Sequence, residues 1–593
     1  LENDFITTMI TPIVKASKKK EVLNFYNLFD YNNWKTSDKN KGNWKIKYYK
    51  GLGTSNSQEA KEYFKTLHIQ EFKYDANNSN QALNLAFDKT QALERKMWLK
   101  TYSESDVLDY TCKDISYKDF VNKELIHFSH ADCLRSIPDI HDGLKPSQRK
   151  IIYSCFKKNL KDEMKVAQLA GYVGEHSSYH HGEASLMGAI TAIAQDFIGS
   201  NNLNLLLPCG QFGTRLMGGK DASSPRYIFT KLAEITSLIF RPEDSIILDY
   251  LNDDGFKIEP KYYKTIIPLI LINGTRGIGT GWSSTVPCYN PIEVIDCIEN
   301  KINDIEIKKL SPWYRNFEGD ILFDKTNYIT KGKYTIQGAY DIHITELPIG
   351  TWTQSYKEFL DSSVKDKNNE DSKKSFLKSY SDYSTECKVD FRLKLCKSYV
   401  DYLGKDGDTT PLDTLLKIKS SADTNIKNMV LYNSKGVLTR YNDTVEIIED
   451  FYGDRLKGYE DRRERQIQEL EKESNILQDK VKFIELILSG DLDMRGKQYK
   501  YVELELQANG LRKLVGSPPS YDYLTDMKMS SQTKERVDEL NKKYNDKQQE
   551  LNSLLDTTPK EIWLKELKQL KEVIVKLYKG NQKKKVVKTT RKK

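Results

Sequence analysis

Residues Cys209 to Thr230 read C-G-Q-F-G-T-R-L-M-G-G-K-D-A-S-S-P-R-Y-I-F-T and hold the most informative pattern in the chain. This stretch places Tyr227 directly after Pro225 and Arg226. A tyrosine hydroxyl can attack a phosphodiester, but the free phenol has a pKa of about 10 and needs positive charge or a base nearby. On residue types alone, a surface loop with a packed tyrosine is the commoner explanation, because the chain holds 36 tyrosines.

Three cations of this stretch are candidates to activate the phenol and to hold a phosphate through charge-assisted hydrogen bonds: Arg215, Lys220 and Arg226. Four glycines lie among them: Gly210, Gly213, Gly218 and Gly219. Glycine lets a backbone come close to a bulky polyanion. The stretch therefore predicts a phosphodiester site with Tyr227 as its candidate nucleophile.

The run from Gly210 to Thr230 resembles the active-site loop of eukaryotic-type DNA topoisomerase II, a type IIA topoisomerase, over a long and nearly gapless match. The resemblance implies that Tyr227 attacks DNA and holds the new 5′ end as a phosphotyrosine. It also implies that Arg226 stabilises the charge that develops on the phosphate.

Composition indicates several domains with real cores, since the chain has 593 residues, of which 30% are charged. No apolar run approaches the length of a membrane span, so we expect no membrane partner. The eight cysteines form no CxxC pair, which favours a reducing compartment over disulfides or a zinc site. The chain opens on Leu1, and we expect a fragment of a longer polypeptide.

The positive charge is concentrated at the C-terminus. Net charge is +8, but the tail from Lys583 to Lys593 carries seven Lys and Arg residues, and without them the net charge is only +1. Clustered charge, not bulk charge, must therefore indicate a DNA surface. We predict no ordered structure for the tail, which fits a nuclear import signal, a DNA-holding tail or a solubilising end. The expected location is the nucleus or a site of viral DNA replication.

Residues 1–110 read as a mixed α/β piece, with a strand at Trp44–Tyr49, a turn at Lys50–Ser55 and a helix near Ser57–Leu67. A glycine loop between strand and helix can cradle phosphate, which makes Lys50 and Gly51 candidate DNA contacts. The piece resembles the end of the family's metal-binding TOPRIM domain. It lacks the glutamate and D-x-D-x-D group that bind magnesium there.

The D-x-D patterns that the chain does hold, Asp406–Asp408 and Asp491–Asp493, are interpreted as solvated turns. Two-metal chemistry on a phosphodiester needs converging carboxylates. We therefore predict no metal ligands in this chain and expect Mg²⁺ to be bound by carboxylates upstream. ATP is expected in an N-terminal portion that is also missing, and no P-loop replaces it.

Residues 111–246 resemble the family's winged-helix DNA-binding domain. Pro146 suits the first turn of a helix whose apolar side holds Ile151, Ile152 and Phe156. The following stretch, Lys165 to Ile190, reads as helix, glycine-containing turn and helix, an arrangement that can place a helix in a DNA groove. By resemblance, Arg135, Lys145 and Arg149 match positions that bind the DNA backbone.

Two adjacent histidines, His180 and His181, follow the first of these helices. Adjacent histidines without Cys or carboxylate spacing rarely bind metal, and hydrogen-bonded loop histidines are the plain alternative. The resemblance of Y-H-H-G-E favours His181 as an active-site residue that assists proton transfer or binds phosphate. His180 is a further candidate DNA contact.

Residues 247–440 are strand-rich and resemble the family's tower domain; Thr265–Gly274 and Tyr340–Pro348 are two such runs. Ile278 sits between glycines and would be exposed at a hairpin tip. An ordinary turn beside a core is the alternative. The family uses the matching isoleucine as a wedge between DNA base steps. Thr275-Arg276 stands where the family usually has Ala-Glu, so the grip on DNA is expected to differ.

Residues 441–580 read as long polar helices. Two sets of apolar residues follow a 3,4 spacing, one broken by Ser474 and the other by Lys547: Ile467, Leu470, Leu477, Val481, Ile484 and Leu488, and Val537, Leu540, Tyr544, Leu551 and Leu554. Two such helices predict an antiparallel coiled coil. Thr558–Glu561 is a capping box that opens the last helix, and Tyr521–Met529 is assigned to a globular tip. By resemblance, the tip belongs to a C-terminal dimer gate.

Together these patterns predict a multidomain α+β fold: a partial TOPRIM α/β piece (1–110), a winged-helix domain with the catalytic tyrosine (111–246), a β-rich tower (247–440), a coiled coil with the dimer gate (441–580) and a basic tail (581–593). The resemblance implies a homodimeric type IIA topoisomerase core acting on double-stranded DNA, with a separate or upstream ATPase/TOPRIM portion. Two alternatives stay open. One is a tyrosine recombinase; the other is a catalytically silent scaffold that binds and bends DNA.

Overall fold

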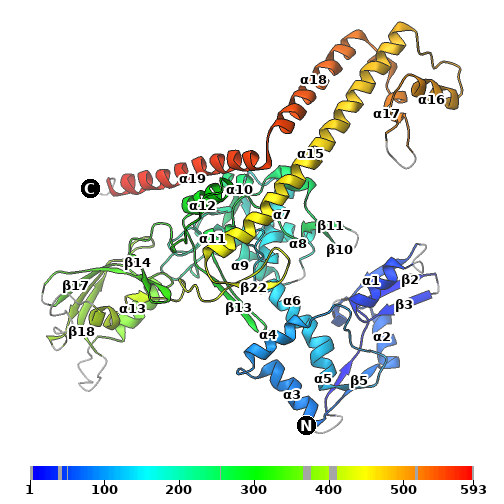
Figure 1. Ribbon diagram of the computed structural model, residues 1–593. Helices are drawn as coiled ribbons and strands as arrows, with labels where there is room; N and C mark the ends of the chain where they lie inside the picture. The colour runs from blue at the N-terminus through cyan, green and yellow to red at the C-terminus, as the bar shows by residue number, and fades with distance from the viewer. Residues whose placement is uncertain are drawn as a thin grey trace.

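The computed structural model describes residues 5–19, 21–37, 43–49, 51–179, 181–253, 256–338, 340–364, 375–397, 399, 410–514 and 519–590 of the chain. Figure 1 shows an N-terminal lobe, a central body, a β-rich lobe on one side of the body, and a long helical arm that projects from it.

The N-terminal lobe holds two three-stranded sheets, with strand orders β1-β5-β6 and β3-β2-β4. Its elements are β1 (Thr7–Met9), β2 (Val14–Lys18), β3 (Glu21–Phe25), α1 (Leu28–Thr36), β4 (Lys45–Tyr48), η2 (Gly51–Thr54), α2 (Ser57–Thr66), β5 (Ile69–Lys73), α3 (Ala76–Phe87), α4 (Ala92–Lys100), β6 (Asp114–Ser116) and α5 (Tyr117–Phe120). The predicted strand, turn and helix are confirmed as β4, η2 and α2. A capping box between Asn56 and Glu59 starts α2.

The central body places a helix-turn-helix beside a small antiparallel sheet of order β7-β9-β8. Its elements are η3 (Val121–Leu125), α6 (Ile126–Ser136), α7 (Pro146–Lys158), β7 (Met164–Lys165), α8 (Val166–His176), α9 (Glu183–Ala194), β8 (Leu206–Cys209), β9 (Phe229–Leu232), α10 (Glu234–Ile239) and η4 (Pro242–Ile246). Pro146 is the first residue of α7, and Ile151 and Ile152 are fully buried, as predicted. The pair α8 and α9 confirms the predicted helix, turn and helix.

The strand-rich region is also confirmed. Its elements are β10 (Tyr250–Asp253), β11 (Phe256–Pro260), α11 (Leu269–Asn273), β12 (Thr275–Gly279), β13 (Trp282–Val286), α12 (Pro291–Ile302), β14 (Asp320–Asp324), β15 (Asn327–Lys331), β16 (Lys333–Ile336), β17 (Asp341–Glu346), α13 (Thr353–Asp361), β18 (Leu377–Asp382), β19 (Phe391–Leu395), α14 (Thr410–Leu415), β20 (Lys419–Ser420), β21 (Met429–Tyr432) and β22 (Leu438–Tyr441). One run differs from the prediction, because Thr265–Gly274 contains the short helix α11. Its residues Leu269 to Ile272 are buried on every side, and a fully apolar run does not separate strand from helix by its period.

The arm consists of α15 (Thr444–Ser489), α16 (Tyr499–Ala508), α17 (Asp522–Thr525), η7 (Met529–Ser531) and α18 (Lys534–Asp556). The next helix, α19 (Pro559–Thr590), runs back along the body and packs on α10 and α12. Helices α15 and α18 pack side by side in opposite directions, and the tip with α16 and α17 joins them (Figure 1). The capping box at Thr558 and Glu561 is confirmed. Helix α19 runs to Thr590 and so includes most of the basic tail, where we predicted no ordered structure.

The two residues that interrupt the heptads lie at the contact between the paired helices. The Gln548 side chain donates a hydrogen bond to the Ser474 hydroxyl at 2.6 Å, and the Lys547 ammonium lies 3.2 Å from Glu473. Near the tip the predicted seam is wrong at Leu488, which is 45% exposed, whereas Phe483 is fully buried. Phe483 packs into the tip core with residues of α16 and α17, so the apolar face turns where the tip begins.

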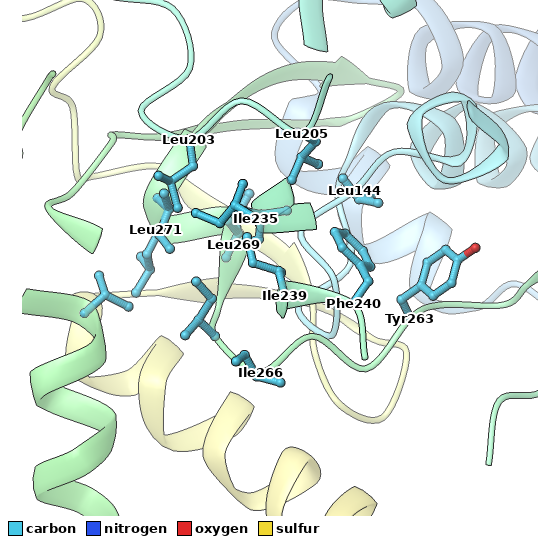
Figure 2. Close-up of a cluster of buried hydrophobic side chains, with 14 of the residues drawn as sticks. Leu144, Leu203, Leu205, Ile235, Ile239, Phe240, Tyr263, Ile266, Leu269 and Leu271 are labelled. Carbon is cyan, nitrogen blue, oxygen red and sulfur yellow. The ribbon is translucent and has the colours of Figure 1, made fainter. Parts of the chain in front are cut away.

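One large hydrophobic core holds the body together. It joins residues of α7, α8, α9, α10, α11, α12 and the bases of α15 and α19. Figure 2 shows part of it, with Ile235 and Ile239 from α10 facing Leu269 and Leu271 from α11. The β-rich lobe and the tip have smaller clusters of their own, and a third cluster joins α3 and α4 of the N-terminal lobe to α6 and β21. Separate cores indicate separate structural units.

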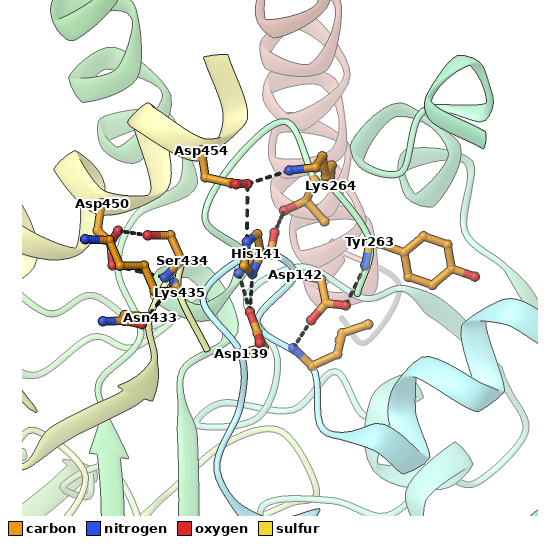
Figure 3. Close-up of polar contacts among 12 residues, drawn as sticks. Asp139, His141, Asp142, Tyr263, Lys264, Asn433, Ser434, Lys435, Asp450 and Asp454 are labelled. Atoms are coloured by element: carbon orange, nitrogen blue, oxygen red, sulfur yellow. Dashed lines mark hydrogen bonds and ion pairs between the residues drawn. The ribbon is translucent and has the colours of Figure 1, made fainter. Parts of the chain in front are cut away.

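A network of charged groups joins the base of α15 to the body (Figure 3). His141, in the loop between α6 and α7, is buried, contacts Asp139 through Nδ1, and has its Nε2 3.3 Å from Asp454 of α15. Lys264 also pairs with Asp454, at 2.7 Å. The His141 ring stacks on Tyr262 at 3.6 Å between centroids. The arm is therefore tied to the body by ion pairs as well as by apolar packing.

The chain is thus a mixed α+β protein of several units. Within the part of the chain that the structure describes, no helix is both long and apolar enough to cross a membrane.

Candidate active site

Tyr227 lies on a tight turn just before β9, and its side chain is 71% exposed. The turn is closed by a hydrogen bond from the Tyr227 N–H to the Ser224 carbonyl at 2.9 Å. Two N–H groups from the start of α8 hold it in place, since Ala167 donates to the Pro225 carbonyl and Val166 to the Ile228 carbonyl. The backbone of the turn is fixed, and the phenol projects away from it.

Arg226 is the cation beside this phenol. Its guanidinium carbon lies 6.0 Å from the centroid of the Tyr227 ring, and its side chain is exposed. A guanidinium presents a fork of donors that matches the oxygens of a phosphate. A phosphodiester that reached the Tyr227 hydroxyl would therefore meet Arg226 as well.

The glycine-rich loop before the turn is folded tightly on itself. The Asp221 carboxylate accepts hydrogen bonds from the N–H and the hydroxyl of Thr214. Gly213 and Gly219 both have positive φ, and a Cβ on Gly213 would lie 2.5 Å from the Gly219 Cα. The glycines therefore serve this close backbone approach. Lys220 is exposed on the same loop.

Arg215 does not face solvent, contrary to the prediction that it contacts DNA. Its side chain is 4% exposed, and Nη2 donates to Glu346 at the end of β17 at 2.6 Å. Glu346 is equally buried and also accepts from the Leu347 N–H. A buried guanidinium with a buried carboxylate forms a structural ion pair that joins the glycine-rich loop to the β-rich lobe.

Arg149 is a second predicted DNA contact that the structure does not support. It is buried and bound in a two-point contact to Asp142, at 2.7 Å and 3.0 Å, and it donates to the Leu144 carbonyl. Asp142 also accepts the N–H groups of Leu144 and Tyr263. Arg149 therefore fixes the loop before α7, and it is not available to a DNA phosphate.

Lys145 is half-buried, and burial lowers the pKa of its ammonium. The ammonium donates to the Arg276 carbonyl on β12 at 2.8 Å. The ammonium that was predicted to bind a DNA phosphate thus binds a backbone oxygen of the hairpin that carries Ile278.

Arg135 and His181, which were predicted separately, are brought together by the structure. Both line a cavity of about 450 Å³ between the end of α6, the start of α7, the turn before α9 and the hairpin β10–β11. Arg135 is exposed and pairs with Asp132 at 2.8 Å. His181 is exposed, with its ring edge-to-face on Tyr179 at 5.5 Å. Lys150 in the same cavity is paired with Glu259 at 2.7 Å, so it is less available than Arg135.

For three other predicted DNA contacts the structure describes few or no side-chain interactions. His180 and Lys50 lie outside the described residues. Gly51 begins the 3₁₀ helix η2, and only its place in that helix is described.

Ile278 is confirmed at the end of a hairpin. Strands β12 and β13 pair antiparallel with Ile278 opposite Ser283, and the Ile278 side chain is 79% exposed. Its two glycine neighbours press the hairpin onto α6. A Cβ on Gly277 would lie 2.2 Å from the Ser136 carbonyl oxygen, and one on Gly279 would lie 3.1 Å from the Cys133 Cα.

Two residues that the sequence did not point to hold the other end of this hairpin. Asp132 accepts from the Thr280 hydroxyl at 3.0 Å, and the Cys133 thiol donates to the Thr280 carbonyl at 3.2 Å. Both lie on α6, far before the hairpin in the chain, and no local pattern connects them to it.

The carboxylates that the structure describes do not fit a magnesium site. Among the described residues, no three His, Cys, Asp or Glu side chains gather as metal ligands would. Asp493 is engaged by Arg495 at 2.9 Å, and Asp491 accepts from the Ser489 hydroxyl, both on the exposed tip. Asp406 and Asp408 lie outside the described residues.

Comparison with known proteins agrees with this geometry. A family model for the A-type polypeptide of DNA gyrase and topoisomerase IV matches residues 135–568, and one described as "C-terminal associated domain of TOPRIM" matches residues 9–133. The first match covers most of the chain and includes the Tyr227 turn and the Ile278 hairpin. The chain belongs to this DNA gyrase/topoisomerase IV family.

Individual relatives define the branch of the family more narrowly, and they confirm the resemblance to eukaryotic topoisomerase II. DNA topoisomerase 2 of Plasmodium falciparum is 41% identical over 605 residues, which is 96% of this chain and 42% of the relative. DNA topoisomerase 2 of Arabidopsis thaliana is 41% identical over 623 residues, 97% of this chain and 41% of the relative. The chain spans about two fifths of the length of these relatives.

A solved structure is similar over nearly the whole chain. The Plasmodium falciparum topoisomerase II DNA-binding, cleavage and re-ligation domain superposes with a TM-score of 0.81 at 40% identity, covering 98% of this chain and 81% of that one. The overall arrangement of units is therefore that of this solved domain.

Proposed function

We propose that this chain is the breakage–reunion core of a type IIA DNA topoisomerase. It makes a transient double-strand break through 5′-phosphotyrosine links, lets a second duplex pass, and reseals the first. This activity changes DNA supercoiling and decatenates DNA. The observation that carries the proposal is Tyr227, an exposed phenol on a rigid turn with the Arg226 guanidinium beside it.

The covalent step conserves the phosphodiester. The Tyr227 oxygen bonds to phosphorus, the bond from phosphorus to the 3′ oxygen breaks, and that oxygen leaves as a 3′-hydroxyl with a proton. Arg226 offsets the added negative charge of the phosphate as the bond forms. In this proposal His181 binds the phosphate or moves a proton at the scissile region. Because the new link is itself a phosphodiester, resealing needs no nucleotide.

The proposed DNA contacts are revised by the structure. Arg135, His181 and Lys220 are exposed and remain candidates for phosphate contacts, which position a duplex without reading its sequence. Ile278 projects from its hairpin as a wedge that unstacks and bends DNA. Lys145, Arg149 and Arg215 act instead within the protein.

Mg²⁺ and ATP belong to the proposal as requirements of the whole enzyme. The described residues offer no carboxylate cluster for Mg²⁺. As the resemblance implies, we place its ligands, and the ATP site, in a portion upstream of this chain.

We also propose the homodimer and the finer domain assignment. The units are a partial TOPRIM piece, a winged-helix domain, a tower, and a coiled coil with a C-terminal gate, at the boundaries predicted above. The tip leaves apolar side chains of α15 and α16 exposed: Leu488, Tyr499, Tyr501 and Leu504. A second copy would cover them. The basic tail supports a nuclear location or a site of viral DNA replication.

The rival functions are less well supported. A tyrosine recombinase needs no long paired helices, and the relatives are named topoisomerases. A silent scaffold that only binds and bends DNA would not need an exposed Tyr227 beside Arg226.

A cleavage assay tests the proposal. The chain is incubated with supercoiled plasmid and Mg²⁺, with and without an upstream metal-binding fragment, and stopped with detergent. We expect protein-linked linear DNA that disappears in Tyr227→Phe and persists in Tyr383→Phe, an exposed tyrosine elsewhere. DNA that is bound and bent but never linked to protein, even with the upstream fragment present, would show that the chain is a scaffold.

A further inference from the structure

A cavity of about 600 Å³ lies in the body, between α7, the segment from α10 to η4, the hairpin β10–β11 and residues Tyr263 and Lys264. None of the predicted DNA contacts lines it. Its volume falls within the range of pockets that hold small organic ligands.

The inner wall of this cavity is aromatic. Phe240 and Tyr263 meet edge-to-face at 5.2 Å between centroids, and Phe156 lies 6.0 Å from Phe240. Tyr153 and Tyr250 complete the wall, and the Tyr153 hydroxyl donates to the Lys257 carbonyl at 3.3 Å, which joins α7 to the hairpin. Flat rings arranged in this way favour a flat apolar guest.

Two lysines at the mouth, Lys157 and Lys257, lie over aromatic rings of the wall. Lys257 lies 3.5 Å from the centroid of Tyr250, and Lys157 lies 5.8 Å from that of Tyr153. Within the described parts of the chain, neither forms an ion pair. The other two cations of the cavity are already paired, Lys264 with Asp454 and Arg241 with Glu243. Spare positive charge above aromatic rings favours an anionic guest.

The floor of the cavity connects it to the arm. Asp244, which lines it, is held by Arg455 and Arg462 of α15 at 2.9 Å and 3.2 Å. Lys264 reaches Asp454 on the same helix. A molecule in the cavity would therefore rest against the groups that fix α15 to the body.

We propose that this cavity is a binding site for a planar aromatic anion, such as a fused-ring carboxylate, sulfonate or phosphate. The rings stack within the aromatic wall, and the anionic group lies between Lys157 and Lys257. This site is separate from the Tyr227 turn, and its occupancy bears on the base of the arm.

The test is isothermal titration calorimetry of the whole chain with naphthalene-2-sulfonate, and with neutral naphthalene-2-methanol for comparison. We expect one site with a Kd below about 1 mM for the sulfonate and at least about tenfold weaker binding of the alcohol. Lys257→Gln and Lys157→Gln should each weaken sulfonate binding by about three- to tenfold. Both side chains are exposed, so the variants should fold.

Lys158→Gln is the matched control, because Lys158 lies next to Lys157 on α7 and over another ring, Tyr172 at 5.3 Å, but outside the cavity. Its sulfonate affinity should stay within about twofold of the unchanged chain. Ser237→Trp, which fills the cavity from α10, should abolish binding. Three outcomes would overturn the proposal. The Lys157→Gln/Lys257→Gln double variant could bind the sulfonate as tightly as the unchanged chain, or the unchanged chain could fail to bind it at millimolar concentration. Plasmid DNA could also displace the sulfonate.

Discussion

Arg215 and Lys220 lie in one glycine-rich loop, yet their side chains point to opposite environments. Lys220 is exposed, whereas Arg215 is buried against Glu346. Both charges suit a phosphate when only the sequence is read. The difference comes from a carboxylate 131 residues further along the chain, which no local pattern reveals.

Replacing Arg215 with alanine should therefore reduce stability more than DNA affinity. The substitution leaves the Glu346 carboxylate buried without a partner, and we expect the free energy of unfolding to fall by about 3–5 kcal/mol. Urea denaturation measures the change. Lys220→Ala is the control and should leave stability within about 0.5 kcal/mol while it weakens DNA binding. A stable Arg215→Ala protein that bound DNA poorly would restore Arg215 as a phosphate contact.

Tyr227, Arg226 and Ile278 were predictable because a short stretch of chain decides their exposure. A turn closed within four residues displays Tyr227, and a two-stranded hairpin displays Ile278. Arg149 was not predictable, because its partner Asp142 is itself held by the N–H of Tyr263, which comes from a distant part of the chain. The direction of a charged side chain depends on tertiary partners, not on its own motif.

At the scale of the secondary-structure elements, the position of the hairpin β12–β13, and with it the exposed Ile278, depends on two glycines and a lysine. Gly277 and Gly279 leave room for α6, and Lys145 binds the Arg276 carbonyl. The hairpin is thus held at both ends, with Asp132 and Thr280 at the other. Local spacing predicted the turn, but the residues that hold it belong to α6 and α7.

Lys145→Met should loosen this hairpin. Methionine keeps an apolar chain of similar length and loses the donor to Arg276, a charged hydrogen bond worth about 1.5–3 kcal/mol. We expect the bent fraction of an end-labelled duplex, measured by energy transfer, to fall by about tenfold or more, with little change in affinity. Ile278→Ala, which removes the wedge and leaves the hairpin in place, should give the same loss. If Lys145→Met instead left bending intact and reduced the salt dependence of DNA affinity by the equivalent of one phosphate contact, the result would support direct contact of Lys145 with DNA.

The arm tip should unfold when Phe483 is truncated. Phe483 is fully buried in the cluster that joins α15 to α16 and α17. Phe483→Ala should cost about 3–5 kcal/mol locally. Hydrogen exchange should show faster exchange in α16 and α17 and unchanged exchange in α8 and α9. Leu488→Ala, an exposed neighbour, is the control, and equal protection of the tip in both variants would contradict the assignment.

Helix boundaries with capping signals were predicted closely, as at Pro146 and Thr558. The heptad seam failed at Leu488 because the tip core draws Phe483 to another side of α15. The all-apolar run at Leu269 to Ile272 failed for a related reason, since its neighbours surround it on every side.

On the scale of the whole molecule, one buried histidine links the body and the arm. Burial alone would lower the pKa of His141, but the carboxylates of Asp139 and Asp454 outweigh it and raise the pKa to about 9. Burial would raise the pKa of Asp454, but His141 and Lys264 lower it to about 2. The pair is therefore charged at neutral pH.

This charge state makes stability depend on pH. Because the pKa of His141 is higher in the folded chain than its ordinary value near 6.5, its contribution is complete below pH 6.5 and is lost as pH rises through about 9. The loss should reach about 3 kcal/mol of the free energy of unfolding. Denaturant titrations between pH 6 and pH 10 measure it, and His141→Gln should flatten the difference. An unchanged slope in that variant would show that His141 is not the group that titrates.

Helix α15 has a mechanical consequence for the molecule. From the ion pairs at Asp454 to its last residue, Ser489, the helix spans about 53 Å at about 1.5 Å per residue. It therefore acts as a lever arm whose pivot combines charged side chains with the apolar packing of its base. A rotation of about 5° at the pivot would displace the far end by about 5 Å, by the same helical rise. A small change in the direction of α15 at His141, Lys264 and Asp454 would thus appear at the tip as a movement of several ångströms.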